Sequence, residues 1–345
     1  MIYVVDEKLA RGYAREYIRK RLAASGACQE AANLPVRESR CRIVAGRVVT
    51  NPVSVMTGWR ASMTRLGGTV VQAGSFRRAA AFWPSWNEMV IEYKLTVGEA
   101  EVSKEDERFF EICVMADGLD IGRKEMIAGG TVGALNADQH ALHRWYQRQP
   151  CAVTFDAARH AAAFESALVG LLPDATLMAA LCGIKSRDSI PCALPIGDGL
   201  LFGYCVYRSN LEAGENPIGI WRRIRSGKPI EAAPSVYVGT GDDNGGGQFF
   251  VGATFYGPDE IIGSLGTVRR ELVSWRDRHA AALDFRWLAD SVLENKPQFQ
   301  KAQQDAADDL GTLMCGNLWQ HEVVNRGSNA ILTKAVKEIA AKGGA

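Results

Sequence analysis

Stretches that predict β-strands lie between residues 41 and 256, and helical patterns occupy both ends of the chain. No clear linker separates the two kinds of segment, and neither an internal repeat nor a low-complexity tract is present. Strands gathered in one part of a chain, with helices before, between and after them, are typical of α+β proteins. At 345 residues with 47% hydrophobic side chains, the chain can bury a large core. We therefore predict one elaborated α+β domain.

Local patterns place the individual elements. Helices are expected over residues 6–25, 136–148 and 156–172, and strands over 41–50, 88–97 and 109–115. Short strands joined by tight turns are expected within 181–207, and two more strands around the glycine-rich turn at 239–247. Residues 53–69 have three glycines and no periodicity, so they predict a long loop. From residue 261 onward the pattern is helical, with four apolar side chains on one face: Leu265, Val268, Leu272 and Trp275.

The sequence carries no sign of export, membrane insertion or metal binding. Only the five apolar residues MIYVV precede the first charge at the N-terminus, and no stretch approaches eighteen apolar residues. We expect a cytoplasmic protein whose eight cysteines are reduced. His140 and His143 lie three apart on an expected helix, but no third ligand follows at a suitable spacing. We predict no metal and no cofactor.

The net charge of +1 hides an asymmetry along the chain. Residues 1–80 contain 14 Lys and Arg against 5 Asp and Glu, a net of +9, so the remaining residues carry −8. A basic first quarter favours one surface that meets a polyanion and other surfaces that meet protein. Four basic side chains of the first helix can equally form its solvated face: Arg15, Arg19, Lys20 and Arg21.

Familiar catalytic and phosphate-binding motifs are missing. The P-loop pattern fails because the single Gly-Lys pair, Gly227-Lys228, is followed by Pro229. The glycines at 239–247 lead into an apolar strand, whereas a dinucleotide site requires a helix N-terminus there. A G-x-S-x-G elbow is also missing. These absences favour a binding or assembly protein, with Cys-His catalysis left open.

The most informative stretch is VVQAGSFRRAAAFW, Val70 to Trp83, which reads as a short strand, a Gly-Ser turn and a helix from Ser75. A helix N-terminus offers unpaired N–H groups and a positive dipole end to a phosphate. Arginines bind phosphates through a planar fork, and exposed Met or aromatic side chains stack on bases. Such side chains are interleaved here: Met56, Trp59, Arg60, Met63, Arg65, Phe76, Arg77 and Arg78. In the alternative interpretation, the apolar members are core and the arginines are ordinary surface.

The order of segments resembles that of the RAMP superfamily of CRISPR proteins. RIVAGRVVTNPVSVM is similar to a first strand ending near Asn-Pro, and VVQAGSFRRAAAFW to the family's Gly-Ser turn before a basic helix. LMAALCGIKSRDSIPCALPIGDGLLF is similar to its Leu-Phe-Gly segment. GGGQFFVGATFYGPDEIIGSLGTVRREL looks like its late strand, acidic turn and helix. Ala73 and Cys182 stand where the family prefers proline and phenylalanine. Size and layout look most like the type IV guide-RNA-binding backbone subunit.

The resemblance implies a ferredoxin-like, RRM-type antiparallel core with inserted thumb and finger segments. The core would span 41–275, after an N-terminal helical extension over 1–40 and before a C-terminal helical segment over 276–345. Four residues of the matching motif would contact guide-RNA phosphates: Gly74, Ser75, Arg77 and Arg78. Reasoning from the residues adds four neighbours: Arg60, Arg65, Trp59 and Met56. The implied partners are guide RNA (crRNA), target nucleic acid, neighbouring copies of the chain and other effector-complex subunits, with no membrane.

Family members that cut target RNA carry an aspartate in the loop after the first strand. Residues 53–68 contain no Asp or Glu, so nothing there could hold a catalytic metal. We expect a non-catalytic backbone subunit that oligomerises along crRNA. The alternative from another class is a phage or viral structural protein that self-assembles into a shell or tube. An enzyme using a cysteine or carboxylate is the third possibility.

Overall fold

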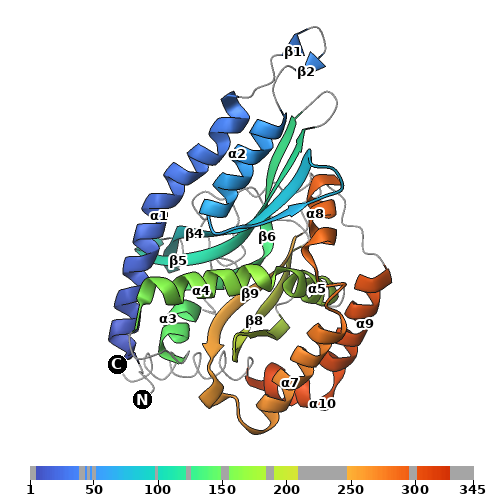
Figure 1. The fold of residues 1–345 in the computed structure, drawn as a ribbon. Coiled ribbons are helices and arrows are strands. Elements are labelled where there is room, and N and C mark those ends of the chain that lie inside the picture. Colours follow the sequence, from blue (N-terminus) through green and yellow to red (C-terminus); the bar gives the residue numbers. More distant parts are fainter. Residues whose placement is uncertain are drawn as a thin grey trace.

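The computed structural model describes ten segments: residues 5–38, 43–44, 47–48, 52–97, 100–121, 126–148, 155–183, 190–208, 247–294 and 301–326. They form a mixed α+β structure around a seven-stranded, mostly antiparallel sheet (Figure 1). The predicted α+β class is confirmed.

The sheet has the strand order β3-β4-β5-β6-β9-β8-β7. Its strands are β3 (Thr69–Gln72), β4 (Arg78–Val97), β5 (Ala100–Ile121), β6 (Met126–Asp138), β7 (Ile190–Ile196), β8 (Gly199–Arg208) and β9 (Gly247–Tyr256). Neighbouring strands are antiparallel except for the central pair β6 and β9, which run parallel. The parallel pair requires a long crossover connection, and part of it consists of helices.

Helices pack around the sheet, and α1 and α2 come before its first strand in the chain. They are α1 (Glu7–Glu38), α2 (Pro52–Arg65), α3 (Gln139–Arg148), α4 (Ala157–Gly170), α5 (Leu172–Gly183), α7 (Gly263–Arg278), α8 (Phe285–Glu294), α9 (Lys301–Cys315) and α10 (Asn317–Trp319), with the short turns η1 (Pro258–Glu260) and η2 (Gln320–Val324). In Figure 1, α1 runs along one side of the molecule, and α7, α9 and α10 lie together at the opposite lower side.

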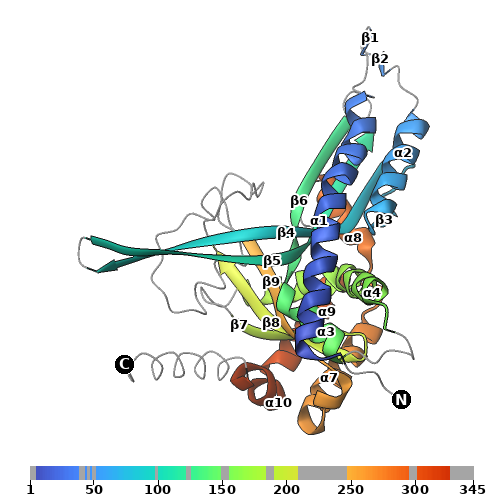
Figure 2. The same cartoon turned by 90° about the vertical axis from the view of Figure 1, so that its left-hand side faces the viewer.

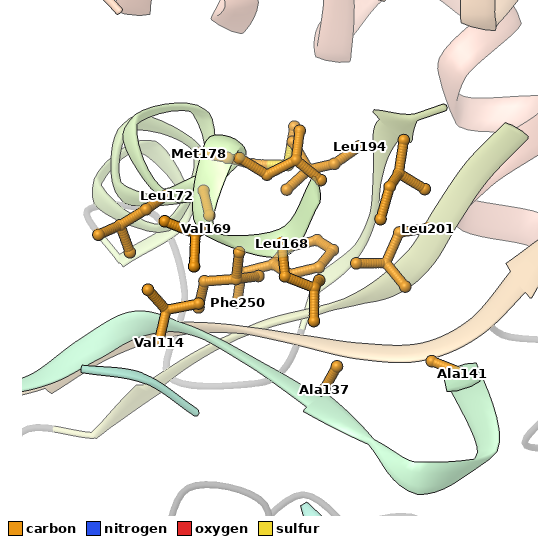
Figure 3. Packing of buried hydrophobic residues seen from close by; sticks show 14 of the residues in the cluster. Val114, Ala137, Ala141, Leu168, Val169, Leu172, Met178, Leu194, Leu201 and Phe250 are labelled. Carbon is orange, nitrogen blue, oxygen red and sulfur yellow. The ribbon is translucent and has the colours of Figure 1, made fainter. Parts of the chain in front are cut away.

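The main hydrophobic core lies between the sheet and α3, α4 and α5. Side chains alternate along β5, so Ile112, Val114 and Ala116 all belong to this core. Figure 3 shows Leu168 and Met178 of the helices above Phe250 of β9. The α4 helix begins where the Asp156 carboxylate accepts the Arg159 N–H at 3.1 Å, as an N-cap does.

The predicted apolar stripe of α7 is confirmed. Leu265, Val268, Leu272 and Trp275 are all buried in the main core. Trp275 Nε1 also donates to the Ala306 carbonyl at 2.9 Å, which joins α7 to α9. The C-terminal helices are therefore part of the same core as the sheet.

A second, smaller core lies on the other face of the β3–β5 corner, under α2. Along β4 the alternate residues Ala79, Ala81 and Trp83 point to this face. Met56 and Trp59 of α2 pack against them. We had expected a loop over 53–69. The helix forms because Val55, Met56, Trp59 and Met63 recur at helical spacing and bury together, which outweighs the helix cost of Gly58.

The β4–β5 hairpin extends far beyond its neighbours in the sheet. The β3 strand pairs with β4 from Ala79 to Phe82, and β6 pairs with β5 from Glu111 onward. The rest of the hairpin, out to the Val97–Ala100 pair, is two-stranded and projects from the body (Figure 2). We call the described residues of this projection, 88–97 and 100–110, the β4–β5 arm.

Other element boundaries differ from the sequence prediction. The first helix continues past Gly26 to Glu38, since one glycine costs a helix only about 1 kcal/mol. Within the strand expected over 41–50, the structure describes β1 (Ile43–Val44) and β2 (Arg47–Val48), which pair with each other in antiparallel orientation and so are not parts of one strand. The strands expected at 88–97 and 109–115 are parts of the longer β4 and β5. The glycine-rich turn and the strand before it lie outside the described residues, except Gly247.

Candidate nucleic-acid interface

The predicted phosphate-binding stretch forms a β-hairpin between β3 and β4, not a strand followed by a helix. The Ala73 N–H donates to the Arg78 carbonyl at 3.0 Å, and the Arg78 N–H donates to the Ser75 carbonyl at 3.1 Å. Gly74 has a φ of 69°, a left-handed value that favours glycine. The expectation of a helix N-terminus at Ser75 is therefore wrong. Pairing of β4 with both β3 and β5 overrides the helix propensity of the alanine run that follows Arg78.

The tip of this hairpin, Gly74 to Arg77, is exposed. The Phe76 side chain is 48% exposed, and the Arg77 guanidinium carbon lies 5.5 Å from the centre of its ring. The guanidinium thus lies over one face of the ring as a cation–π contact. Aromatic side chains and arginines are the groups that stack on bases and contact phosphates in proteins that bind single strands. The predicted site residues do not include Phe76, although its aromatic side chain next to two arginines in the sequence is the signal that could have indicated it.

Arg78 occupies a different environment from Arg77. Its Nε lies 2.9 Å from an Asp120 carboxylate oxygen, and both side chains are partly buried. This ion pair connects the start of β4 with the end of β5. Of the two adjacent arginines, Arg77 is thus the one presented to solvent.

The other predicted residues lie on α2. Arg60 donates to Gln72 Oε1 at 3.3 Å and is partly buried, whereas Arg65 is exposed in the last turn. Met56 and Trp59 are 4% and 3% exposed, inside the second core. They fix α2 to the sheet and present no surface for stacking on a base. For Met56 and Trp59, the alternative interpretation of the sequence, in which the apolar residues belong to the core, is therefore correct. It does not hold for Phe76, whose side chain is exposed.

Arg21, one of the basic residues of the first helix, has a structural role. Its Nε and Nη2 donate to the two Glu165 oxygens at 3.1 and 2.9 Å, and Nη2 also donates to the Leu66 carbonyl at 3.0 Å. Trp86 Nε1 donates to the same carboxylate at 2.7 Å. Burial and the Glu165 charge raise the pKa of Tyr17 well above its usual value, so this phenol stays neutral.

The solvated side of α1 carries the remaining cations. Lys20 pairs with Glu16 at 2.6 Å, and Arg11 pairs with Glu7. Arg15 and Arg19 are exposed and form no ion pair with the part of the chain that the structure describes. The basic first quarter therefore supplies free positive charge from α1, from Arg65 and from Arg77.

Comparison with known proteins gave no match: no family model, no curated protein and no solved structure is similar to this chain. Within the described segments, no group of three His, Cys, Asp or Glu side chains is placed to hold a metal ion. No single helix there is long and apolar enough to cross a membrane; the bent pair α4 and α5 passes that test together, with a 49° bend.

Proposed function

We propose that the protein is a non-catalytic backbone subunit that oligomerises along a CRISPR guide RNA. The observation that carries the proposal is the exposed hairpin tip of β3 and β4, where Phe76 and Arg77 stand next to Gly74 and Ser75. A backbone subunit that binds guide RNA of any sequence needs contacts to phosphates and to the faces of bases, because every nucleotide offers these groups.

The arrangement of the central strands supports a ferredoxin-like core. In the order β5-β6-β9-β8, the middle pair is parallel and both flanking pairs are antiparallel, and α3, α4 and α5 follow β6. These are the pairings of a ferredoxin-like sheet. One departure is that β5 precedes β6, whereas the corresponding strand of that unit comes last in the chain.

The β4–β5 arm supports assembly through neighbouring copies. A two-stranded hairpin is at best marginally stable in water by itself, so an arm of this length favours contact with another molecule. Residues 88–110 contain seven Asp and Glu against three Lys and Arg. An acidic arm and a basic first quarter on the same chain are complementary in a head-to-tail assembly.

The first test is purification without nuclease treatment. We expect the protein to retain RNA of discrete length and to lose its filaments when the RNA is digested. Assemblies that form without nucleic acid and survive digestion would contradict the proposal and favour the phage or viral structural protein.

The second test examines the hairpin tip directly. Arg77→Ala should lower the slope of log Kobs against log salt concentration by about 0.7, the value for one phosphate contact on a single strand. Phe76→Ala should weaken RNA binding about fivefold or more with little change in slope, because it removes a stacking contact. Electrophoretic or fluorescence titrations over a range of salt measure both.

The matched control is Arg270→Ala, an exposed arginine of α7. This helix contacts β7, at the opposite edge of the sheet from β3. Arg78→Ala is a poorer test, since it also breaks the ion pair with Asp120. If Arg77→Ala behaves like Arg270→Ala, the hairpin tip does not bind RNA.

A further inference from the structure

The β4 strand forms one outer edge of the β4–β5 arm. The β3 strand ends opposite Phe82, and no described strand pairs with β4 beyond that residue on this side. An edge of this kind presents a row of N–H and C=O groups that can bond a further strand. The arm therefore offers a template for strand addition.

Two backbone hydrogen bonds show which β4 residues present their N–H and C=O groups at this edge. The Arg78 carbonyl accepts the Ala73 N–H, on the β3 side, at 3.0 Å. The Arg77 carbonyl accepts the Ile121 N–H, on the β5 side, at 2.9 Å. Because this direction alternates along a strand, the even-numbered residues of β4 face away from β5.

The position of a proline agrees with this assignment. Pro84 has no N–H to donate to a neighbouring strand, and it is even-numbered. The register of β4 with β5 is unbroken up to Leu95. The backbone groups of Val90, Glu92 and Lys94 are therefore the ones at the outer edge of the arm.

The sequence of this part of β4, MVIEYKLTV, is complementary to itself in the antiparallel direction. When two copies lie with Tyr93 opposite Tyr93, Glu92 of each copy lies opposite Lys94 of the other. Opposite charges directly across a strand pair stabilise it, as do pairs of apolar and aromatic residues. The same register gives only apolar and aromatic pairs at the odd-numbered positions: Tyr93 with Tyr93, Ile91 with Leu95, and Met89 with Val97.

The pairing inside the arm is less favourable for the same charges. The register of β4 with β5 places Glu92 opposite Asp106 and Lys94 opposite Lys104. Like charges directly opposite each other destabilise a strand pair. Glu92 and Lys94 thus fit a second copy of β4 better than they fit β5.

We propose that two copies of the chain pair through the β4 edges of their arms, antiparallel, about a two-fold axis at Tyr93. The arms then point in opposite directions, so the two bodies lie at opposite ends and do not collide. Both copies use the same surface, so the contact closes as a dimer. It does not depend on the guide-RNA proposal. It also leaves free for a basic partner the β5 side of the arm, which carries four acidic residues: Glu101, Glu105, Asp106 and Glu107.

The first experiment is analytical ultracentrifugation of the full chain after nuclease treatment, which removes any assembly that requires RNA. We expect a concentration-dependent dimer. Glu92→Lys or Lys94→Glu alone should weaken this dimer about tenfold or more, because each creates two like-charge pairs across the contact. Both substitutions together should restore it, since the exchange re-creates the opposite-charge pairs. Each substitution also removes a like-charge pair inside the arm, so a damaged arm does not explain the loss.

The matched control for these variants is Glu107→Lys, which makes the same change of charge on β5. It should leave the dimer nearly unchanged. Four results would each overturn the proposal: a monomer at every concentration, an exchange variant as weak as the single variants, an equal loss with Glu107→Lys, or open-ended polymers.

A second experiment tests the two-fold axis by disulfide formation. Tyr93→Cys places two thiols at a non-hydrogen-bonded pair, where the Cα atoms lie about 4.5 Å apart, within reach of a disulfide. Mild oxidation with diamide should therefore link two chains on a non-reducing gel. Leu95→Cys has Ile91 opposite it and controls for the eight native cysteines. Equal linkage of the two variants would contradict an axis at Tyr93.

Discussion

At the scale of single residues, the stability of the fold depends on how buried charged side chains are paired. Asp174, in the first turn of α5, is fully buried, and its carboxylate lies 2.6 Å from Nε of Arg276 on α7. Desolvation outweighs the neighbouring cation and raises the pKa of Asp174 to about 6. The ion pair thus compensates a burial cost, and its loss would leave a carboxylate alone in the core.

Arg276→Gln should therefore destabilise the protein by about 3 to 5 kcal/mol at pH 7.5. Because the folded pKa of Asp174 is raised, this group favours folding at low pH, and that contribution is lost as the pH rises through about 6. The cost of Arg276→Gln should accordingly shrink near pH 5. Urea denaturation at both pH values measures it, and Asp174→Asn added to Arg276→Gln should restore part of the loss. An equal cost at both pH values would show that Arg276 acts by packing alone.

His143 predicts the opposite pH dependence. Its folded pKa of about 4 lies below the ordinary 6.5, so above pH 6.5 the ring is neutral in both states. As the pH falls from 6.5 to 4, the unfolded chain binds a proton that the folded chain does not, and stability falls by about 3 kcal/mol at most. His143→Gln should remove most of that fall between pH 7 and 4.5 in low-salt denaturation curves. His321→Gln, with an exposed ring, is the control; matching pH profiles for His143→Gln and the wild type would refute the assignment.

At the scale of elements, two features shape the sheet and its surroundings: the close contact of α8 with β5, and the prolines of the outer strand β7. The α8 helix packs on β5 at Gly118, where an added Cβ would lie 3.0 Å from Leu293 and 3.2 Å from Val292. The outer strand β7 carries Pro191 and Pro195, which lack the N–H that another strand would use. Both prolines hinder the pairing of a further strand at this edge of the sheet.

Gly118→Val should push α8 away from the sheet and cost about 1 to 3 kcal/mol, as overpacking does. Leu293→Ala should recover part of that loss when combined with Gly118→Val, although it is destabilising alone. Chemical denaturation gives the double-mutant cycle, and hydrogen exchange should show α8 opening first. Gly12→Ala is the control, since an added Cβ meets nothing within 4 Å there and the change favours the helix. Simple additivity of Gly118→Val and Leu293→Ala would contradict a direct contact.

At the scale of the whole molecule, α1 connects the parts. Its buried residues Ala10, Ala14 and Ile18 belong to the main core, and Arg21 reaches both Glu165 of α4 and the end of the α2 segment at Leu66. In Figure 2 it crosses the root of the β4–β5 arm. The first helix is thus packed into the body, with its basic side left in solvent.

Periodicity alone determined the α+β class, the buried stripe of α7 and the existence of most helices and strands, because the side chains that repeat at helical or strand spacing are the ones that bury. The tertiary structure decided that the chain after Gly74 forms a strand and not a helix. Local propensity favours a helix in the alanine run after Arg78, but the two neighbouring strands satisfy its backbone and form β4 instead. Long-range packing also separated Trp59, buried between α2 and the sheet, from Phe76 and Arg77, left in solvent. The ion pairs Arg78–Asp120 and Arg21–Glu165 likewise join residues far apart in the sequence, so local pattern could not reveal them.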